Sequence, residues 1–316
     1  MDYLLECASH SPIVNSRGAA PREIEEEVAA GYAQIASRIN EFNPEILVLF
    51  GTDHASSFSL SGMPPACVGL RAHALGDYDL PLGQVLTNPQ LGQSCINALH
   101  EQGVDVAGSY EMQLDHGFTQ LLQQIFGRYD RYPVLPIFIN CASEFRMPIK
   151  RTRALGEAVG TFIRSTGLRA VFMGSGGLSH DPPTPRVSDD MSPAVRQRLI
   201  NGVDWTDAML RDRTTKVYAA IREYAEGRSK LKRLNPEWDA QFLEDMLSAD
   251  LDRLSAHTDA SIIADAGKGG GEVRTWIAAA CAMTTAAGGY SAVVDYSRAV
   301  DEWMTGMAML HGYPEC

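Results

Sequence analysis

The segment Glu45-Ile46-Leu47-Val48-Leu49-Phe50, followed by Gly51-Thr52-Asp53-His54, gives the strongest indication of the fold class. A short, continuous apolar run that stops at a glycine is typical of a strand buried on both faces. Such strands belong to sheets that helices cover on both sides. His54 follows the end of the apolar run by four residues. The segment therefore predicts a buried strand that brings a histidine to one edge of a sheet.

The same arrangement recurs along the chain. Further apolar runs predict strands, and segments with helical spacing lie between them. The predicted strands are Tyr3–Ala8, Pro133–Asn140 and Ala170–Met173, and the predicted helices are the one opened by Pro21, Phe118–Phe126 and Arg153–Ser165. This alternation predicts an α/β fold, a mixed central sheet with helices on both faces. Ligands bind beyond the carboxyl ends of strands in such sheets. Because His10, His54 and His180 each follow a predicted strand, we expect a metal site at that edge.

The remainder of the chain is predicted to be mostly helical. Trp205–Tyr224 and Pro236–Leu247 are the clearest helices between residues 193 and 254, and Asn235 before Pro236 is a good helix start. Glu272–Ala286 predicts a further, buried helix. We find no repeat and no linker, so we expect one domain over residues 1–316 with a helical insertion around 188–260.

Composition restricts the classes of partner. The chain has 316 residues and a net charge of −12, which argues against nucleic acid and anionic membranes as partners. An anionic substrate would need a local positive pocket. Six cysteines form no CxxC pair, so we expect free or buried thiols in a reducing compartment. There is no signal-peptide pattern and no apolar stretch of ~20 residues, so the cytoplasm is the expected location.

Four of the eight histidines lie in short polar motifs that are far apart in sequence: Ser9-His10-Ser11-Pro12, Thr52-Asp53-His54, Leu114-Asp115-His116-Gly117 and Gly174–His180. Glu272 follows another glycine-rich stretch. Two neutral imidazoles and one carboxylate are the ligand set of non-haem iron(II) oxygenases, although zinc hydrolases use it too. Two further histidines would be left for proton transfer. His73, His100, His257 and His311 have no such motif.

Other types of site have weaker support. Gly174–Gly177 and Ala266–Gly271 lack the pattern of a phosphate-binding loop, and Gly174-Ser175-Gly176 falls short of the nucleophile elbow of serine hydrolases. A zinc-dependent hydrolase and a non-catalytic metal-binding protein remain as alternatives to an iron enzyme.

The chain resembles the class III extradiol catechol dioxygenases, the superfamily that includes the β-subunit of protocatechuate 4,5-dioxygenase. The resemblance runs in order along nearly the whole chain, and only 188–229 and the C-terminal tail diverge. It is carried by Ala8–Pro12, Leu47–Phe50 with Asp53-His54, Met63-Pro64-Pro65 with Cys67, Met112-Gln113, Asp115–Phe118, Val134–Asn140, Arg151–Arg153, Gly174–His180 with Pro182-Pro183, Leu234–Pro236 with Trp238-Asp239, Ala266–Lys268, and Glu272 with Thr275-Trp276.

The resemblance implies that His10, His54 and Glu272 bind Fe(II), and that His116 and His180 act as the acid–base pair. It implies O2 and a 3-substituted catechol as substrates. The expected catechol is 2,3-dihydroxyphenylpropionate, which would give 2-hydroxy-6-oxonona-2,4-dienedioate in aromatic catabolism. A catechol with another 3-substituent remains an alternative, and a homo-oligomer is expected.

Four charged residues near these motifs have two interpretations each. Asp53 and Asp115 directly precede histidines and could orient metal-site imidazoles, or they could serve as turn or cap residues. Lys268 and Arg274 flank Glu272 and could bind the substrate's carboxylate, or they could be charges at helix ends. The divergent 188–229 segment could line or cover the pocket.

Overall fold

The computed structural model describes residues 2–143, 145–183, 187 and 190–315. Over these residues eight strands form one sheet in the order β10-β11-β1-β9-β2-β8-β3-β6, and a second sheet has the order β5-β4-β7. The strands of the main sheet are β1 (Tyr3–Ala8), β2 (Ile46–Gly51), β3 (Ala66–Gly69), β6 (Ala107–Ser109), β8 (Val134–Ile139), β9 (Ala170–Ser175), β10 (Tyr290–Val300) and β11 (Thr305–Pro314). Those of the small sheet are β4 (Ala72–Ala74), β5 (Gly83–Val85) and β7 (Met112–Leu114).

The centre of the main sheet is parallel, and its outer parts are mixed. β1 pairs in parallel with β9, β9 with β2, and β2 with β8. β11 is antiparallel to β1, and β3 is antiparallel to β8. The sheet is therefore mixed, as predicted. Three neighbouring strands, β1, β9 and β2, end at the same edge, because Ala8 is paired with Ser175 and Phe50 with Gly174.

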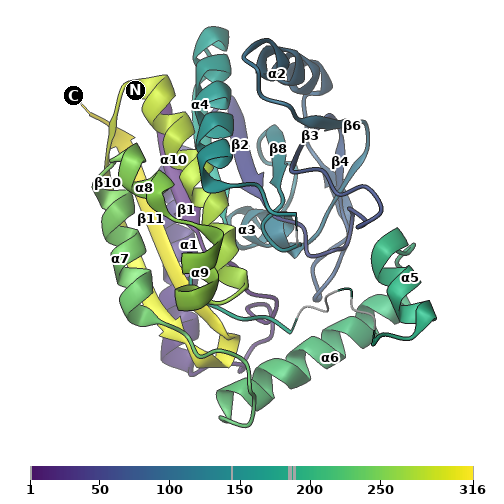
Figure 1. Ribbon diagram of the computed structural model, residues 1–316. Coiled ribbons are helices and arrows are strands. Elements are labelled where there is room, and N and C mark those ends of the chain that lie inside the picture. The colour runs from purple at the N-terminus through teal and green to yellow at the C-terminus, as the bar shows by residue number, and fades with distance from the viewer. Residues whose placement is uncertain (1, 144, 184–186, 188–189, 316) are drawn as a thin grey trace.

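Helices cover both faces of the sheet, also as predicted (Figure 1). Ile46, Val48 and Phe50 of β2 belong to the hydrophobic cluster that includes α4 (Ile149–Thr166) and α10 (Val273–Ala287). Leu47 and Leu49 belong to the cluster that includes α1 (Arg22–Phe42) and α3 (His116–Phe126). Because successive side chains in a strand point to opposite faces, one uninterrupted apolar run supplies both cores.

The helices are α1 (Arg22–Phe42), α2 (Pro89–Glu101), α3 (His116–Phe126), α4 (Ile149–Thr166), α5 (Pro193–Asn201), α6 (Asp207–Ala225), α7 (Pro236–Leu247), α8 (Leu251–Ala256), α9 (Asp259–Ala266) and α10 (Val273–Ala287). The turn Gly269–Glu272 (η1) precedes α10, and Asp301–Trp303 (η2) follows β10. The predicted helices are confirmed to within a few residues at each end. Asn235 caps α7, because its side chain accepts a hydrogen bond from the Trp238 N–H. Helix α6 lies at the end of the molecule opposite the two termini (Figure 1).

The sequence reading missed the short and peripheral strands. The strands β4, β5 and β7 have three residues each, too few to show the alternation that identifies a strand. The hairpin of β10 and β11 was also missed, although β11 pairs directly with β1 at the other end of the chain. Such pairing depends on contacts distant in sequence, which local patterns do not report.

Cys7, Cys67, Cys95, Cys141 and Cys281 are free and buried, as expected; Cys316 lies outside the described residues. Among the described residues, each helix is too short or too polar to cross a membrane.

Helices α4 and α10 pack so closely that a side chain at Gly160 has no room. A Cβ at Gly160 would lie 2.3 Å from the carbonyl oxygen of Ala282. In an exposed helix, replacement of glycine by alanine raises stability. Here we expect Gly160→Ala to lower the free energy of unfolding by about 1–3 kcal/mol, because overpacking outweighs helix propensity.

Urea unfolding of the two variants Gly160→Ala and Gly62→Ala measures this difference. A Cβ at Gly62 would meet no heavy atom within 4 Å, so that variant is the matched control. An unchanged or raised midpoint for Gly160→Ala would show that α4 and α10 are less tightly packed.

Candidate metal centre and active site

The structure brings His10, His54 and Glu272 together, although they are far apart in sequence. His10 follows β1, His54 follows β2, and Glu272 immediately precedes α10. The Nε2 atom of His10 lies 3.4 Å from Glu272 Oε2, and the Nε2 atom of His54 lies 3.1 Å from Glu272 Oε1. The shared edge of β1, β9 and β2 therefore carries two imidazoles and one carboxylate.

The tautomers of His10 and His54 follow from the partners of their Nδ1 atoms. Ser175 donates its hydroxyl to the carbonyl of Gly117 at 2.6 Å, so its oxygen accepts from His10 Nδ1–H at 3.0 Å. The Asp115 carboxylate accepts from His54 Nδ1–H at 3.2 Å and from the His54 backbone N–H at 2.8 Å. The Nε2 atom of each ring faces Glu272, and in a neutral ring with its proton on Nδ1 this atom has the lone pair that a metal ion would bind.

His116 is held in the same way by a residue that the sequence reading did not identify. Asp77 accepts from His116 Nδ1–H at 2.7 Å, and both side chains are buried. The His116 ring stacks on that of His54, with 4.2 Å between centroids, and meets that of Tyr78 edge-on at 4.6 Å. The Asp77 carboxylate thus fixes a proton on Nδ1 of His116 and leaves Nε2 as the free ring nitrogen.

His180 reaches the cluster from the loop after β9. Its Nδ1–H donates to the carbonyl of Leu178 at 2.9 Å, and its Nε2 lies 3.3 Å from Glu272 Oε1. Glycine is required beside it, because a Cβ at Gly269 would lie 2.1 Å from His180 Nε2. The glycine-rich turn before Glu272 therefore serves close packing against a histidine and does not form a phosphate loop.

Glu272 is buried, and the histidines around it favour its ionised form. Burial alone would raise the pKa of this carboxyl, but the charges and hydrogen bonds of His180, His10 and His54 hold it well below its usual range. The backbone N–H of Gly177 also donates to Oε2 at 2.8 Å. The position just before α10 adds the positive end of a helix dipole.

The pKa values of the two histidines nearest Glu272 differ in direction. Burial lowers the pKa of His10 to about 3, despite the opposing charge of Glu272. Burial also acts to lower the pKa of His54, but Asp115 and Glu272 outweigh it and raise that pKa to about 10. Positive charge is thus stabilised at His54, and a metal cation bound there would replace the proton.

The donor atoms fit a metal ion. The Nε2 atom of His10 is buried and has no hydrogen-bond partner, an uncommon state for a polar atom. Ring nitrogens of His10, His54 and His116 lie within 4.8 Å of one another. A cation among these nitrogens and Glu272 would satisfy the His10 lone pair and balance the carboxylate. Two histidines and one carboxylate are a donor set for iron(II) or zinc.

Asp53 and Asp115 have different roles in the loops. Asp53 accepts from the backbone N–H groups of Ser56, Ser57 and Phe58, which are the contacts of a turn residue. Burial and the nearby Asp115 raise the pKa of Asp53 to about 7. Asp115 caps α3 and also holds His54. His54 and His116 are therefore each held by an aspartate distant in sequence and not by the aspartate that precedes them.

Lys268 and Arg274 make contacts within the protein. The Nζ of Lys268 lies 3.4 Å from Asp181 Oδ1. Arg274 is fully buried, and its guanidinium donates to the carbonyls of Met147 and Gly271 and to the carboxylate of Asp259. These contacts brace the start of α10 and give little support to a substrate role for Arg274.

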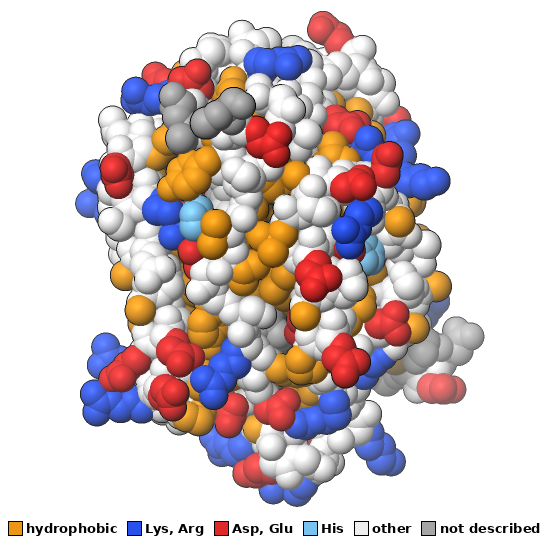
Figure 2. All heavy atoms as spheres, turned by 90° about the vertical axis from the view of Figure 1, so that its left-hand side faces the viewer, with side chains coloured by type: hydrophobic (Ala, Val, Ile, Leu, Met, Phe, Trp, Pro, Cys, Tyr) orange, Lys and Arg blue, Asp and Glu red, His pale blue; other side chains and the backbone are white. Residues whose placement is uncertain are grey.

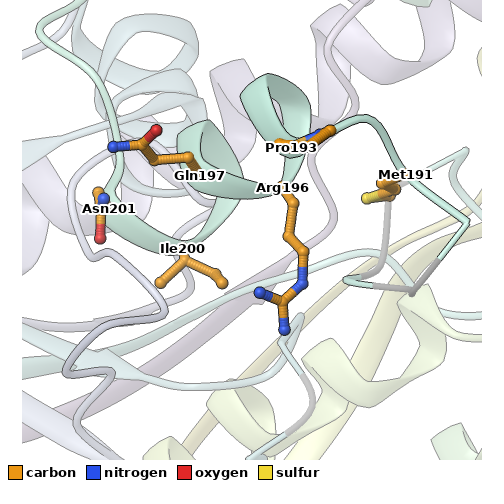
Figure 3. A pocket seen from close by; sticks show the side chains of 6 residues that line it. All are labelled: Met191, Pro193, Arg196, Gln197, Ile200 and Asn201. Atoms are coloured by element: carbon orange, nitrogen blue, oxygen red, sulfur yellow. The ribbon is translucent and has the colours of Figure 1, made fainter.

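A cavity of about 570 Å³ lies beside α5. Arg196 and Ile200 point into it (Figure 3). Its other lining residues are Met191, Pro193, Gln197 and Asn201. Because none of the clustered histidines lines it, this cavity is distinct from the candidate metal centre.

The comparison with protein families agrees with this geometry. Residues 4–308 match the family described as the catalytic LigB subunit of aromatic ring-opening dioxygenase. The chain belongs to this family. It is accordingly a dioxygenase, and the histidine–carboxylate cluster fits the metal site of such an enzyme.

Several curated relatives match over nearly the full length. The chain is 39% identical to a 2,3-dihydroxyphenylpropionate/2,3-dihydroxicinnamic acid 1,2-dioxygenase of Photorhabdus laumondii, over 99% of this chain and 98% of the relative. It is 40% identical to the enzyme of that name from Paraburkholderia xenovorans, with the same coverage. An uncharacterised protein of Escherichia coli K12 shares the fold, with a TM-score of 0.52, 12% identity and 98% of each chain covered.

Sequence reasoning missed three residues of the site: Asp77, Ser175 and Arg213. Arg213 lies in α6 and donates to the backbone carbonyl of His54. Of these three residues, Asp77 lies next to a backbone feature that is common at functional sites. Its neighbours Tyr78 and Asp79 both have positive φ, 49° and 63°, and non-glycine residues in this conformation tend to gather at functional sites. The sequence does not report φ, so the signal becomes visible only in the structure.

Proposed function

We propose that this dioxygenase uses iron(II) to cleave a 3-substituted catechol outside its two hydroxyl groups, with 2,3-dihydroxyphenylpropionate as the substrate. The observation that carries the proposal is the cluster of four histidines, three of them in contact with Glu272, each with Nδ1 engaged by a separate acceptor. The names of the full-length relatives support the substrate. The expected product is 2-hydroxy-6-oxonona-2,4-dienedioate.

His10, His54 and Glu272 would hold the iron. When bound, iron(II) supplies Lewis acidity toward the catechol oxygens and a route for electrons to O2. Ser175 and Asp115 would keep the two imidazoles in the ligating tautomer. The buried walls around His10 and Glu272 exclude water from one side of the centre.

His116 and His180 would handle the protons. We assign His116 as the base that removes a catechol hydroxyl proton, because the Asp77 carboxylate stabilises the resulting imidazolium. His180 would be the acid that returns a proton during ring opening. Its Nδ1–H is tied to a neutral backbone carbonyl, which leaves Nε2 facing the centre.

The metal and substrate can be tested together. We expect metal-free protein to regain activity with ferrous iron and ascorbate but not with zinc. Anaerobic mixing with 2,3-dihydroxyphenylpropionate followed by air should give a yellow product, measured by its visible absorbance. Activity with zinc and not iron would point to a hydrolase; colour only with another 3-substituted catechol would overturn the substrate alone.

Variants separate iron binding from proton transfer. We expect His10→Ala, His54→Ala and Glu272→Ala to lose iron. His116→Ala and His180→Ala should keep iron but lose turnover by a factor on the order of 10² or more.

Asp77→Asn should keep iron and lower kcat by about tenfold, because a neutral partner stabilises the His116 imidazolium less.

Iron content and kcat are measured on the same preparations. The exposed Asp79→Asn is the matched control for Asp77→Asn, since it removes the same charge two residues away. Full iron occupancy in a ligand variant would remove that residue from the set. Normal turnover in His116→Ala or His180→Ala would refute the acid–base role.

We also propose a homo-oligomer in the cytoplasm. Strand β10 is the outermost strand of the main sheet, so one of its edges has no strand partner within the described residues. Apolar side chains gather on the side of the molecule that carries β10 (Figure 2), and Val293 of β10 is 55% exposed. Light scattering should give a mass that is a multiple of the 34.4 kDa chain; a monomeric mass would contradict the oligomer.

A further inference from the structure

The helical segment after residue 190 brings one cation to the metal centre. Arg213 lies in α6, and its guanidinium donates to Ser56 Oγ at 2.7 Å and to the backbone carbonyl of His54 at 3.0 Å. It also lies over the rings of Trp205 and Tyr78, at 5.0 Å and 5.4 Å from their centroids. The charge is thus held in place beside a proposed iron ligand.

This guanidinium has no ion-pair partner within the described residues, where no carboxylate oxygen lies within 4.0 Å of it. Asp77, Asp115 and Asp53 are near enough to interact with its charge. Hydrogen bonds already engage them, Asp77 with His116, Asp115 with His54 and Asp53 with the turn after it. Because Arg remains charged in proteins, a partly buried Arg with neutral acceptors and aromatic neighbours is suited to bind an anion.

The position of Arg213 agrees with the accessible side of the centre. The side chain of His54 is 16% exposed, compared with 2% for His10 and Glu272 and 10% for His180. Among these four side chains His54 is therefore the most accessible, and Arg213 contacts its backbone carbonyl. Tyr78 connects the same guanidinium to the His116 ring. A substituent that extends from a catechol ring at the centre would meet Arg213 on this side.

We propose that Arg213 binds the carboxylate of the substrate's side chain and so determines the preference for catechols with an acidic 3-substituent. The inference rests on the proposed ring cleavage. Arg213 takes the place of Lys268 and Arg274 as the proposed partner of this carboxylate, because the charges of those two residues pair with Asp181 and Asp259. The chain's net charge of −12 makes a local cation necessary, since the overall field repels an anionic substrate.

The test compares two catechols of equal side-chain length on the iron-loaded, full-length protein. The first is 2,3-dihydroxyphenylpropionate, and the second is 3-propylcatechol, in which a methyl group replaces the carboxylate. We expect Arg213→Gln to lower kcat/KM for the acid by about 10- to 100-fold, the effect of losing a hydrogen bond to a charged group. The value for 3-propylcatechol should change several-fold less, and Arg213→Lys should restore part of the preference.

Two variants serve as comparators. Arg211→Gln removes the same charge from an exposed position of α6 and should leave the ratio of the two kcat/KM values unchanged. Arg196→Gln removes the cation that points into the cavity beside α5 (Figure 3) and should also leave it unchanged.

Three results would overturn the inference. An equal fall for both catechols in Arg213→Gln would show that Arg213 only supports the His54 loop. A loss of preference in Arg196→Gln instead would place the carboxylate in the α5 cavity. A wild-type protein that cleaves 3-propylcatechol as well as the acid would show no such recognition. Failure of the wild type to cleave either catechol would instead contradict the proposed function itself.

Discussion

The arrangement of the centre depends on one buried carboxylate. Glu272 contacts the Nε2 atoms of His10, His54 and His180, and these residues come from three loops that follow three neighbouring strands. A buried carboxylate surrounded by imidazoles is stable only if positive charge is present, as protons or as a metal ion. The charge balance at Glu272 therefore links the folding of both ends of the chain to the chemistry of the site.

The partners of the Nδ1 atoms give the four histidines different properties. Ser175 and the Leu178 carbonyl are neutral acceptors for His10 and His180, whereas Asp115 and Asp77 are carboxylate partners of His54 and His116. A carboxylate on Nδ1 makes the opposite nitrogen more basic. The sheet places the rings, and these acceptors then fix the position of the proton on each ring. Helix α6 adds the cation Arg213 on the accessible side.

Much of the fold could be predicted from the sequence, because the central strands are long, apolar and bounded by turn residues. The run 45–50 was recognisable for this reason, and so were the helices that cover it. The strands β4, β5 and β7 were not predictable, since three residues show no period. At the site, the motif residues His10, His54, His116, His180 and Glu272 were found. Their roles as ligands or acid–base groups came from the family resemblance.

The residues that orient the site were beyond sequence reasoning for a physical reason. Adjacency suggested that Asp53 and Asp115 act on the histidines next to them, but a side chain and its sequence neighbour usually point in different directions. Asp115 instead reaches His54, and Asp77 reaches His116 from the loop after β4, the strand that runs parallel to β7. Likewise Lys268 and Arg274 are close to Glu272 in sequence, whereas Arg213 is close to the centre in space.

The most direct test of the central claim is a crystal structure of the iron-loaded protein with anomalous scattering measured at the iron edge. We predict one iron per chain, bound by His10 Nε2, His54 Nε2 and a carboxylate oxygen of Glu272, with His116 outside ligand distance and still hydrogen-bonded to Asp77. Iron bound by the three imidazoles of His10, His54 and His116, with Glu272 left out, would contradict it.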